Sequence, residues 1–429
     1  MATPDDFSLL DDMTRECPYP YFQSIREHAP VYFMEEIQAW YVSRYEDVRY
    51  VKKHPALFSS NMEAHGARSG AARDAAEDYR TAHGWKRVST LQRTDPPAHT
   101  KYRKLINQAF SVKRVRAMTG YIEAIVNDLI DSFINKGRAD FVTAYAIPLP
   151  CTVIADQLGV PRDRISDLKK WSDAMLAPGS GFINAAQAIE SAKLVVEAQH
   201  FFAATIEARR RDPQDDIITD LALARVIDEV GAAPRPLDMY ECLDLMDQLL
   251  TGGNETTTNA LGSALMLVLQ RPQLVNALRD HPQALRNFVE ETLRFETPVL
   301  HLWRVTTKDT HIGKTAIPKG QRIALSYASA NRDEAVFPNA ETFDPFRNKA
   351  GAHLAFGSGP HHCPGAALSR QEIFSTFTVL LNRLENLRVQ DPNEQFRHVP
   401  NIFLRGLASL EIEFDVRNAE RYCPNASVY

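Results

Sequence analysis

Residues 356–365 read Phe-Gly-Ser-Gly-Pro-His-His-Cys-Pro-Gly, so a single cysteine, Cys363, stands among three glycines. A helical pattern of apolar residues follows at once, over residues 366–381. A thiolate at a helix N-terminus is stabilised by the helix dipole and by free backbone N–H groups, which lower its pKa. Glycine has no Cβ, so three glycines let the backbone pass close to a flat surface such as a macrocycle. The stretch therefore predicts that Cys363 is an anionic ligand held against a flat partner.

Other uses of His361, His362 and Cys363 have to be weighed. A zinc site needs four ligands, and no second cysteine or histidine cluster supplies the remaining pair. A cysteine nucleophile of the papain type needs a general base and an oxyanion hole, which adjacent histidines do not supply by themselves. A lone cysteine is ordinarily a buried, inert residue. From the residues alone, the ligand and the inert cysteine stay open.

The composition of the whole chain narrows the function classes. Its 429 residues carry 49 basic and 54 acidic side chains, a net charge of −5, which gives no general attraction to nucleic acid or anionic lipid. The apolar run at 261–269 is far shorter than a membrane span, and acidic residues precede the first basic one, unlike a signal peptide. The five cysteines form no C-x-x-C pair. We expect a cytoplasmic protein that binds neither nucleic acid nor membrane.

The pattern along the chain predicts one domain, residues 1–429, that is mainly α with a small β-rich region. Residues 31–35 and 39–43 indicate a hairpin within about 30–60, and apolar residues recur at helical spacing from about 97 to 283. A long central helix is expected over 236–270, with Asp238 as its N-cap and Pro272 beyond its end. Gly252 and Gly253 lie inside it and cost about 1 kcal/mol each relative to alanine. Either the helix ends there, or a widened turn directs Thr256 towards a flat ligand and its guest.

Here a family resemblance enters. Residues 356–365 match the haem-binding signature F-G-x-G-x-H-x-C-x-G of the cytochrome P-450 superfamily at every defined position. Glu291 and Arg294 resemble the family's E-x-x-R, whose spacing places both groups on one helix face. Arg347, within residues 343–347, resembles the arginine that completes a buried ion-pair network with them. Residues 95–103 resemble the D-P-P-x-H-x-x-x-R motif. The similarity runs from about residue 15 to the end, in the family's order.

The resemblance implies the cytochrome P-450 fold, a triangular prism-like single domain with a long helix over the cofactor haem b (iron protoporphyrin IX). Cys363 would be the iron ligand, in place of the open alternatives above. The haem propionates would be held by His99, Arg103, Arg304 and His361. Further contacts to haem are expected from Phe356, Gly357, Gly365 and Gly252.

The resemblance also implies a monooxygenase that activates O₂ with two electrons. Thr256 would hold the oxygen by hydrogen bonding, and Glu255 would relay protons to it. Because the chain has neither a flavin or nicotinamide motif nor a four-cysteine set, the electrons would come from a ferredoxin or flavodoxin with its NAD(P)H reductase. The soluble bacterial class, acting as a monomer, is expected. Candidates for the docking face, equally readable as a solvated helix face, are Lys104, Lys113, Arg114 and Arg370.

For the substrate, the resemblance points to mainly apolar segments, which favour a small lipophilic organic molecule that is hydroxylated, O-dealkylated or epoxidised. Candidate pocket residues are Leu249, Leu250, Gly253, Val299, Leu300, His301 and Phe403. Residues 62–92 are expected to be a long loop acting as a lid. One alternative is a haem-thiolate enzyme of a natural-product pathway that acts on a carrier-bound substrate or catalyses coupling or dehydration. Another is a non-catalytic haem-binding or gas-sensing protein.

Overall fold

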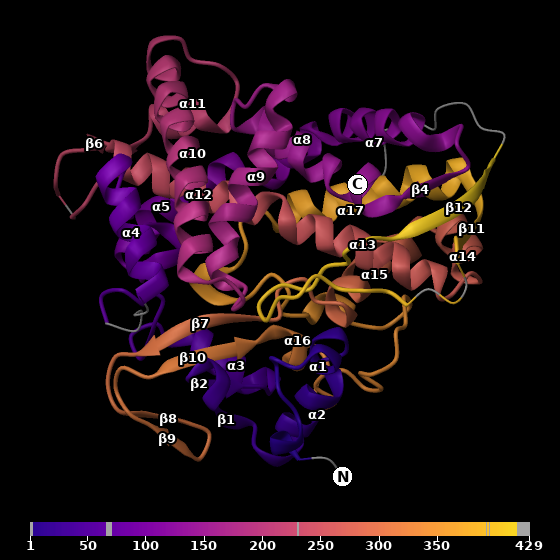
Figure 1. Cartoon of the computed structure of the whole chain (residues 1–429), viewed down its shortest axis with the longest axis horizontal. Helices are drawn as coiled ribbons and strands as arrows, with labels where there is room; N and C mark the ends of the chain where they lie inside the picture. The colour runs from indigo at the N-terminus through magenta and orange to yellow at the C-terminus, as the bar shows by residue number, and fades with distance from the viewer. Residues whose placement is uncertain (1–2, 66–70, 230, 392, 394, 418–429) are drawn as a thin grey trace.

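A computed structural model describes residues 3–65, 71–229, 231–391, 393 and 395–417 of the chain (Figure 1). The helices are α1 Asp12–Glu16, α2 Tyr19–His28, α3 Tyr45–Lys53, α4 Ala71–His83, α5 Ala98–Ala109, α6 Val112–Ala117, α7 Thr119–Ile134, α8 Pro148–Gln157, α9 Ile165–Leu176, α10 Ala185–Arg211, α11 Ile217–Ala222, α12 Met239–Gly253, α13 Glu255–Leu269, α14 Leu274–Asp280, α15 Pro282–Phe295, α16 Tyr327–Ala330 and α17 Ala366–Arg383. The strands are β1 Val31–Met34, β2 Ala39–Val42, β3 Phe58–Ser59, β4 Arg138–Asp140, β5 Arg225–Val226, β6 Arg235–Pro236, β7 His301–Thr306, β8 Thr310–Ile312, β9 Thr315–Ile317, β10 Arg322–Ser326, β11 Leu384–Val389 and β12 Glu411–Val416. Helices thus dominate, and the strands form small sheets, as the sequence predicts.

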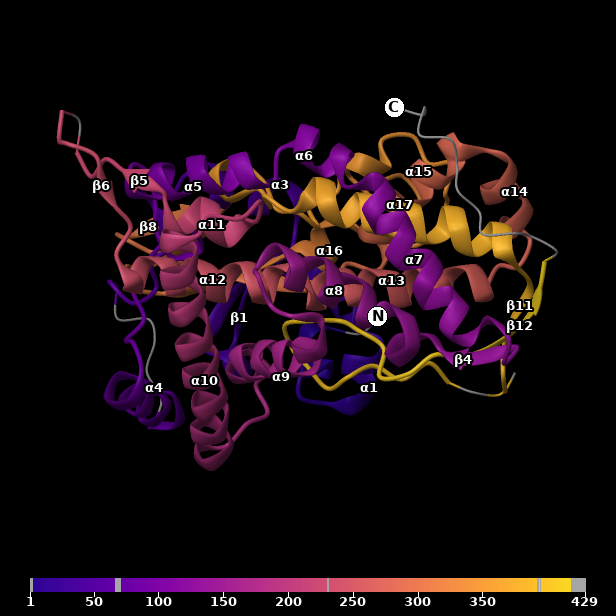
Figure 2. The same cartoon turned by 90° about the horizontal axis from the view of Figure 1, so that it is seen from above.

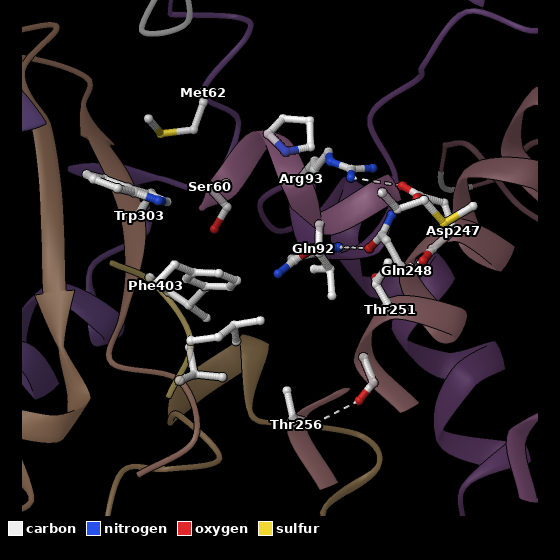
Figure 3. A pocket seen from close by; sticks show the side chains of 18 of the residues that line it. Ser60, Met62, Gln92, Arg93, Asp247, Gln248, Thr251, Thr256, Trp303 and Phe403 are labelled. Atoms are coloured by element: carbon white, nitrogen blue, oxygen red, sulfur yellow. Dashed lines mark hydrogen bonds and ion pairs between the residues drawn. The ribbon is translucent and has the colours of Figure 1, made fainter. Parts of the chain in front are cut away.

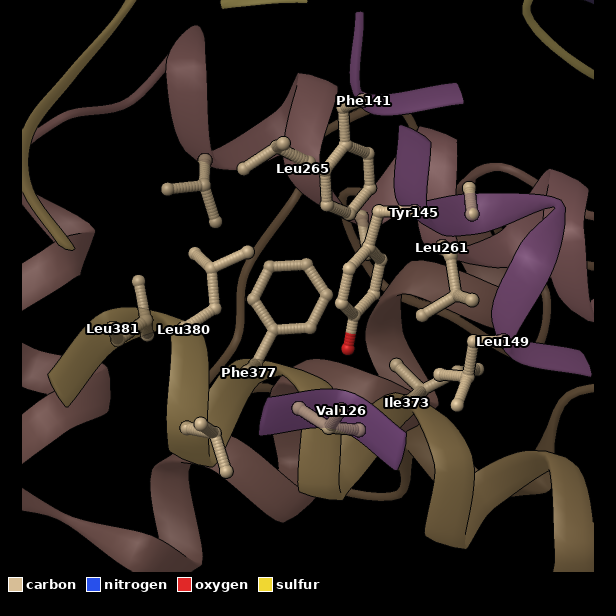
Figure 4. Packing of buried hydrophobic residues seen from close by; sticks show 14 of the residues in the cluster. Val126, Phe141, Tyr145, Leu149, Leu261, Leu265, Ile373, Phe377, Leu380 and Leu381 are labelled. Atoms are coloured by element: carbon tan, nitrogen blue, oxygen red, sulfur yellow. The ribbon is translucent and has the colours of Figure 1, made fainter. Parts of the chain in front are cut away.

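The main core lies where α7, α8 and α15 surround α13 and α17. Residues 257–268 of α13 are buried without interruption, which is the pattern of a helix enclosed on all sides. Figure 4 shows how the rings of Phe141, Tyr145 and Phe377 pack among leucines of α13 and α17. The Tyr145 hydroxyl donates a hydrogen bond to Thr376 Oγ1 at 2.9 Å, so its buried polar atom is satisfied. This core holds α13 and α17 in fixed relation to each other.

The expected helix over 236–270 is in fact two helices, α12 and α13, separated at Asn254 (Figure 2). Asp238 is the predicted N-cap: its carboxylate accepts from the Glu241 N–H at 2.8 Å in a capping box. At the break, Asn254 is buried and its Oδ1 accepts a hydrogen bond from the Ser172 hydroxyl at 3.1 Å. A Cβ on Gly253 would come within 2.9 Å of Ile154 Cγ1 on α8, whereas one on Gly252 would meet nothing within 4 Å. Gly253 is therefore required by the close packing of α12 against α8, whereas Gly252 borders open space.

A five-stranded sheet of order β1-β2-β10-β7-β3 lies beside the helical body, next to the N-terminal helices (Figure 1). β1 and β2 form the expected antiparallel hairpin, with Val31 opposite Val42. β2 then pairs in parallel with β10, which pairs antiparallel with β7. The sheet carries β7 to the edge of the large cavity described below.

The segment 62–92, expected to be a long loop, contains α4 and the 3-10 turn Leu91–Arg93. Alanine is the strongest helix former, and residues 71–76 contain four alanines. The helix propensity of these alanines outweighs the glycines that suggested a loop. Residues 66–70, within the expected lid, lie outside the described residues. None of the helices in the described part is long and apolar enough to cross a membrane.

Candidate functional site

A cavity of about 1290 Å³ lies between the start of α17, the junction of α12 and α13, strand β7 and the turn Leu91–Arg93. Figure 3 shows its upper part, with Trp303, Met62 and Phe403 facing Gln92 and Gln248 across an open centre. The walls combine segments that are more than 300 residues apart in the chain. The cavity is large enough for a macrocycle together with a small guest.

Cys363 lines this cavity directly before α17 begins at Ala366. Its N–H donates to the Phe356 carbonyl at 2.8 Å, and Gly357 and Gly359 adopt positive φ angles of 68° and 67° that close the loop. A Cβ on Gly365 would lie 3.8 Å from the cysteine sulfur. These glycines therefore leave the thiol facing the cavity from a tightly folded loop.

The electrostatics at this thiol differ from the sequence-based expectation. Burial raises the pKa of Cys363, and the N–H groups of Gly365 and Ala366, with Arg103 and Arg370, only partly oppose that effect. The sequence led us to expect a lowered pKa; this is wrong for the protein alone, because the loss of water outweighs the helix N-terminus. A bound metal cation would supply the missing positive charge, since a coordinating thiol is deprotonated.

The four predicted propionate partners all line the cavity and come together. The rings of His99 and His361 lie 4.3 Å apart between centroids, and His361 Nε2 is 3.1 Å from the Ser60 hydroxyl. His99 is almost fully buried, and its Nε2 has no hydrogen-bond partner among the described residues. Arg304 is also buried and donates to the Trp303 carbonyl at 2.6 Å. Four donors from three distant segments thus surround one part of the cavity.

This part of the cavity is rich in positive charge. Burial, followed by the nearby cations, lowers the pKa of His99 to about 4 and that of His361 to about 2. Arg103 donates to the carbonyl of His362, and neither Arg103 nor Arg304 has an acidic ion-pair partner in the described segments. Buried cations without counterions cost several kcal/mol, so the cluster is arranged for an anion that enters the cavity.

Glu255 and Thr256 stand at the start of α13 and line the same cavity. The Thr256 hydroxyl donates to the Gly252 carbonyl at 3.1 Å, across the helix break (Figure 3). Glu255 Oε2 lies 3.4 Å from Lys169 Nζ, and burial raises the pKa of this carboxyl. The structure brings this acid and alcohol to the cavity that Cys363 also faces.

The predicted ion-pair network is present away from the cavity, behind the cysteine loop. Glu291 is fully buried and accepts from Arg294 Nε at 2.7 Å and Nη2 at 2.8 Å. Arg347 Nε lies 3.1 Å from the same carboxylate. Both guanidinium groups also donate to the Thr342 carbonyl, at 3.2 and 2.7 Å. The network therefore ties α15 to the segment 338–347 that precedes the loop.

The candidate substrate residues divide into two groups. Leu249, Gly253, Val299 and Phe403 line the cavity, and so do Met62, Leu91, Gln92, Met175, Leu302 and Leu404, which belong to the segments expected at the pocket. Gln248 and Trp303 also line it, although the sequence did not single them out for the pocket. Phe356, Gly357, Gly365 and Gly252, expected to contact haem, line it as well.

Three of the candidate pocket residues are corrected: Leu250, Leu300 and His301 do not line the cavity. Leu250 is one position along α12 from Leu249, so it turns about 100° away into the core. Leu300 packs with the N-terminal helices and sheet. His301 is fully buried against Tyr41, and no partner for either of its ring nitrogens occurs in the described chain.

Lys52 and Glu372 are buried and line the cavity, and the sequence did not single them out. Burial raises the pKa of Glu372 well above its ordinary value. Lys52 lies on the amphipathic helix α3, where a lysine normally indicates a solvated face, and Glu372 lies on α17, which is buried over most of its length. Only the packing of distant segments reveals that they are buried.

The expected docking face is partly occupied by ion pairs. Arg114 is paired with Asp220 at 2.6 Å, and Arg370 with Glu290 at 2.6 Å. Lys104 and Lys113 are exposed. A docking role for these four residues stays a prediction.

Comparison with known proteins gives consistent matches. The family model described as Cytochrome P450 matches residues 40–405. The chain is 32% identical over 412 residues to linalool 8-monooxygenase of Pseudomonas putida, covering 95% of this chain and 98% of that protein. It is 34% identical over 399 residues to the putative cytochrome P450 YjiB of Bacillus subtilis, covering 92% and 93%. The structure of cytochrome P450 CYP109Q5 from Chondromyces apiculatus superposes with a TM-score of 0.83 at 31% identity, over 96% of this chain and 99% of that one.

Proposed function

The chain belongs to the cytochrome P450 family, and from this premise we propose that it is a monooxygenase acting on a small, lipophilic, uncharged organic molecule. Membership confirms the fold and the haem cofactor expected from the sequence, and makes the protein an oxidoreductase that uses O₂ and redox partners. The observation that carries the proposal is one cavity lined by Cys363, by a cationic cluster, and by Glu255 and Thr256. Hydroxylation, O-dealkylation or epoxidation is the proposed outcome.

The residues present fit a haem. Cys363 would bind the iron, and the buried His99 and Arg304, with the half-buried Arg103 and His361, would bind the propionates. Two facts support this fit: among the described residues, His99 Nε2 has no hydrogen-bond partner, and neither the buried Arg304 nor the half-buried Arg103 has a carboxylate partner. When bound, the haem iron supplies the redox chemistry that activates O₂.

Substrate binding would depend on the upper cavity. Leu249, Val299 and Phe403 offer apolar surface, which favours a lipophilic guest and removes water from the site. The charged groups near the turn Leu91–Arg93 compensate each other: Arg93 pairs with Asp244 at 2.5 Å and with Asp247 at 3.1 Å. An uncharged molecule therefore fits this wall better than an acid or an amine. The name of the Pseudomonas relative, a linalool monooxygenase, supports a substrate of this kind.

Proton delivery is assigned to the chain's own acid and alcohol. Thr256 Oγ1 can release the Gly252 carbonyl and donate to an oxygen atom in the cavity, while it accepts a bond from water. Burial raises the pKa of the Glu255 carboxyl above its ordinary value, which favours the uptake of a proton and supports a role in proton relay. Lys169, beside Glu255, would hold the carboxylate in its resting position.

Electrons are proposed to come from a ferredoxin or flavodoxin with its NAD(P)H reductase. The exposed Lys104 and Lys113 support an acidic partner, because complementary charge steers association. Conversion assays with each class of electron donor would decide between the two.

The first test is the spectrum of the purified, reduced protein with carbon monoxide. We expect a strongly red-shifted Soret band that is lost in Cys363→Ala and retained in Cys17→Ala, a control at an exposed cysteine. An unshifted band in the wild type, or a Cys363→Ala variant with the wild-type spectrum, would overturn the proposed thiolate ligand.

The second test addresses the alcohol. Thr256→Ala should keep its haem but divert reducing equivalents to hydrogen peroxide. Thr258→Ala is a matched control, because that hydroxyl is buried and donates to the Ala146 carbonyl at 3.0 Å, outside the cavity lining. Product analysis with labelled O₂ and measurement of peroxide per NAD(P)H follow both variants. Full coupling in Thr256→Ala would contradict the role given to this residue.

A further inference from the structure

A lysine occupies the buried face of α3. In this helix, Tyr45, Val48 and Val51 are buried at helical spacing, and Lys52 continues the same stripe. Its side chain is only 4% exposed, whereas the next residue, Lys53, is exposed. The stripe would be completed by an apolar residue if packing were the only requirement. A buried lysine at this position therefore needs a group that compensates the charge of its ammonium.

The protein itself provides only a weak partner. Lys52 Nζ donates a hydrogen bond to the Tyr327 hydroxyl at 3.3 Å, and no acidic group pairs with it in the described part of the chain. Burial and the charge of Arg304 hold the pKa of Lys52 well below its ordinary value. An ammonium group buried without a counterion costs several kcal/mol.

The surroundings of Lys52 make the deficit of negative charge larger. His99, Arg103, Arg304 and His361 line the same cavity as Lys52, and the rings of the two histidines lie 4.3 Å apart. Lys52 Nζ would lie 3.5 Å from a Cβ on Gly357, in the loop that carries His361. The carboxylate of Asp95 accepts hydrogen bonds from the Ser59 hydroxyl at 2.5 Å and the Ser60 N–H at 2.9 Å, and no ion pair joins it to Lys52 within the described residues. Since Lys52 lines the cavity, the missing anion can approach only from inside it.

We propose that Lys52 is a further haem-binding residue, whose ammonium group forms an ion pair with a haem propionate beside His99, Arg103, Arg304 and His361. This inference rests on the haem site of the proposed function. It adds α3 to the segments that hold the cofactor and links the N-terminal part of the chain to the cysteine loop. The Lys52 carbonyl, which a Cβ on Gly359 would meet at 3.0 Å, already packs against that loop.

The test compares haem-loaded Lys52→Met with Lys53→Met, which removes the same charge one position away on the surface. Transfer of haem to apomyoglobin should be about tenfold faster or more in Lys52→Met, because a charge-assisted hydrogen bond to the haem is lost. Lys53→Met should stay within about twofold of the wild type, and Lys52→Arg, which keeps the charge, should lie close to it.

Two spectroscopic readouts separate propionate binding from a structural effect. In Lys52→Met the propionate-bending band of the resonance Raman spectrum should shift, and the ferric–ferrous potential should become more negative, because a nearby cation is lost. Tyr327→Phe should leave both unchanged. Haem loss equal to that of Lys53→Met, or faster loss with an unshifted band and potential, would overturn the inference. Failure of the proposed function would instead appear in the wild type, as the absence of the thiolate spectrum.

Discussion

Replacing Glu291 with glutamine removes a buried carboxylate that two arginines share. The substitution keeps the shape of the side chain and changes its charge. Arg294 now donates to this carboxylate at 2.7 and 2.8 Å, and Arg347 at 3.1 Å. The Asp344 N–H also donates to it at 2.9 Å. In the variant, two buried guanidinium groups would face one neutral amide.

The expected loss in the free energy of unfolding depends on the hydrogen bonds that the two arginines keep in the variant. Arg294 keeps hydrogen bonds to the Asn331 and Ala340 carbonyls at 2.8 and 2.9 Å, so its donors are not all orphaned. The uncompensated charge remains, and breaking a buried pair in this way costs about 3–5 kcal/mol. Glu46, on α3, pairs with Arg49 at 3.0 Å, and their side chains are 71% and 35% exposed. Glu46→Gln should therefore cost about 1 kcal/mol or less.

The assay is urea unfolding of the haem-loaded proteins, with differences taken from the midpoints at a common slope. Arg347→Met should cost less in the Glu291→Gln background than in the wild type, because it then removes an unpaired charge. Glu291→Gln should also yield less haem-loaded protein, since the network anchors the segment ahead of the cysteine loop. A cost no greater than that of Glu46→Gln, or simple additivity in the double variant, would refute the reasoning.

Further expected outcomes concern acid stability and the cavity wall. Burial lowers the pKa of His301 to about 3 from 6.5, so the unfolded state takes up a proton first and the free energy of unfolding falls as pH drops below 6.5. This group should contribute a loss of about 1.4 kcal/mol in the free energy of unfolding per pH unit, so His301→Phe should lose less stability than the wild type between pH 6.5 and 5. If urea unfolding at these two pH values shows the same loss for the wild type and the variant, the expectation is wrong. Leu249→Phe should weaken binding of lipophilic ligands, measured by spin-state titration, by narrowing the cavity. Leu250→Ala should leave that binding unchanged but lower the free energy of unfolding by about 2–5 kcal/mol, and the reverse pattern would mean that the two side chains have been placed on the wrong faces of α12.

The parts of the site that are local in sequence were predictable. The Cys363 loop is encoded by contiguous residues, because its glycines provide the positive φ angles and the helix that follows is visible in the periodicity. The spacing of Glu291 and Arg294 places them on one face of α15, and Asp238 caps α12 as expected. The family signature then connected these local features to a fold and a cofactor.

What depends on distant packing was not predictable. The sequence could not separate Leu249 from Leu250, nor show that His301 turns into an aromatic core, because the side a residue faces is set by neighbours far along the chain. It could not show that helix packing, with Ile154 against Gly253, accompanies the break at Asn254. Lys52 is the clearest example, because nothing in the sequence around it shows that it is buried in the cavity wall. The sequence by itself determined the ligand loop, the helix caps and the family, since those need only short-range geometry; the tertiary structure decided which charges are buried together, since desolvation arises only when remote segments exclude water.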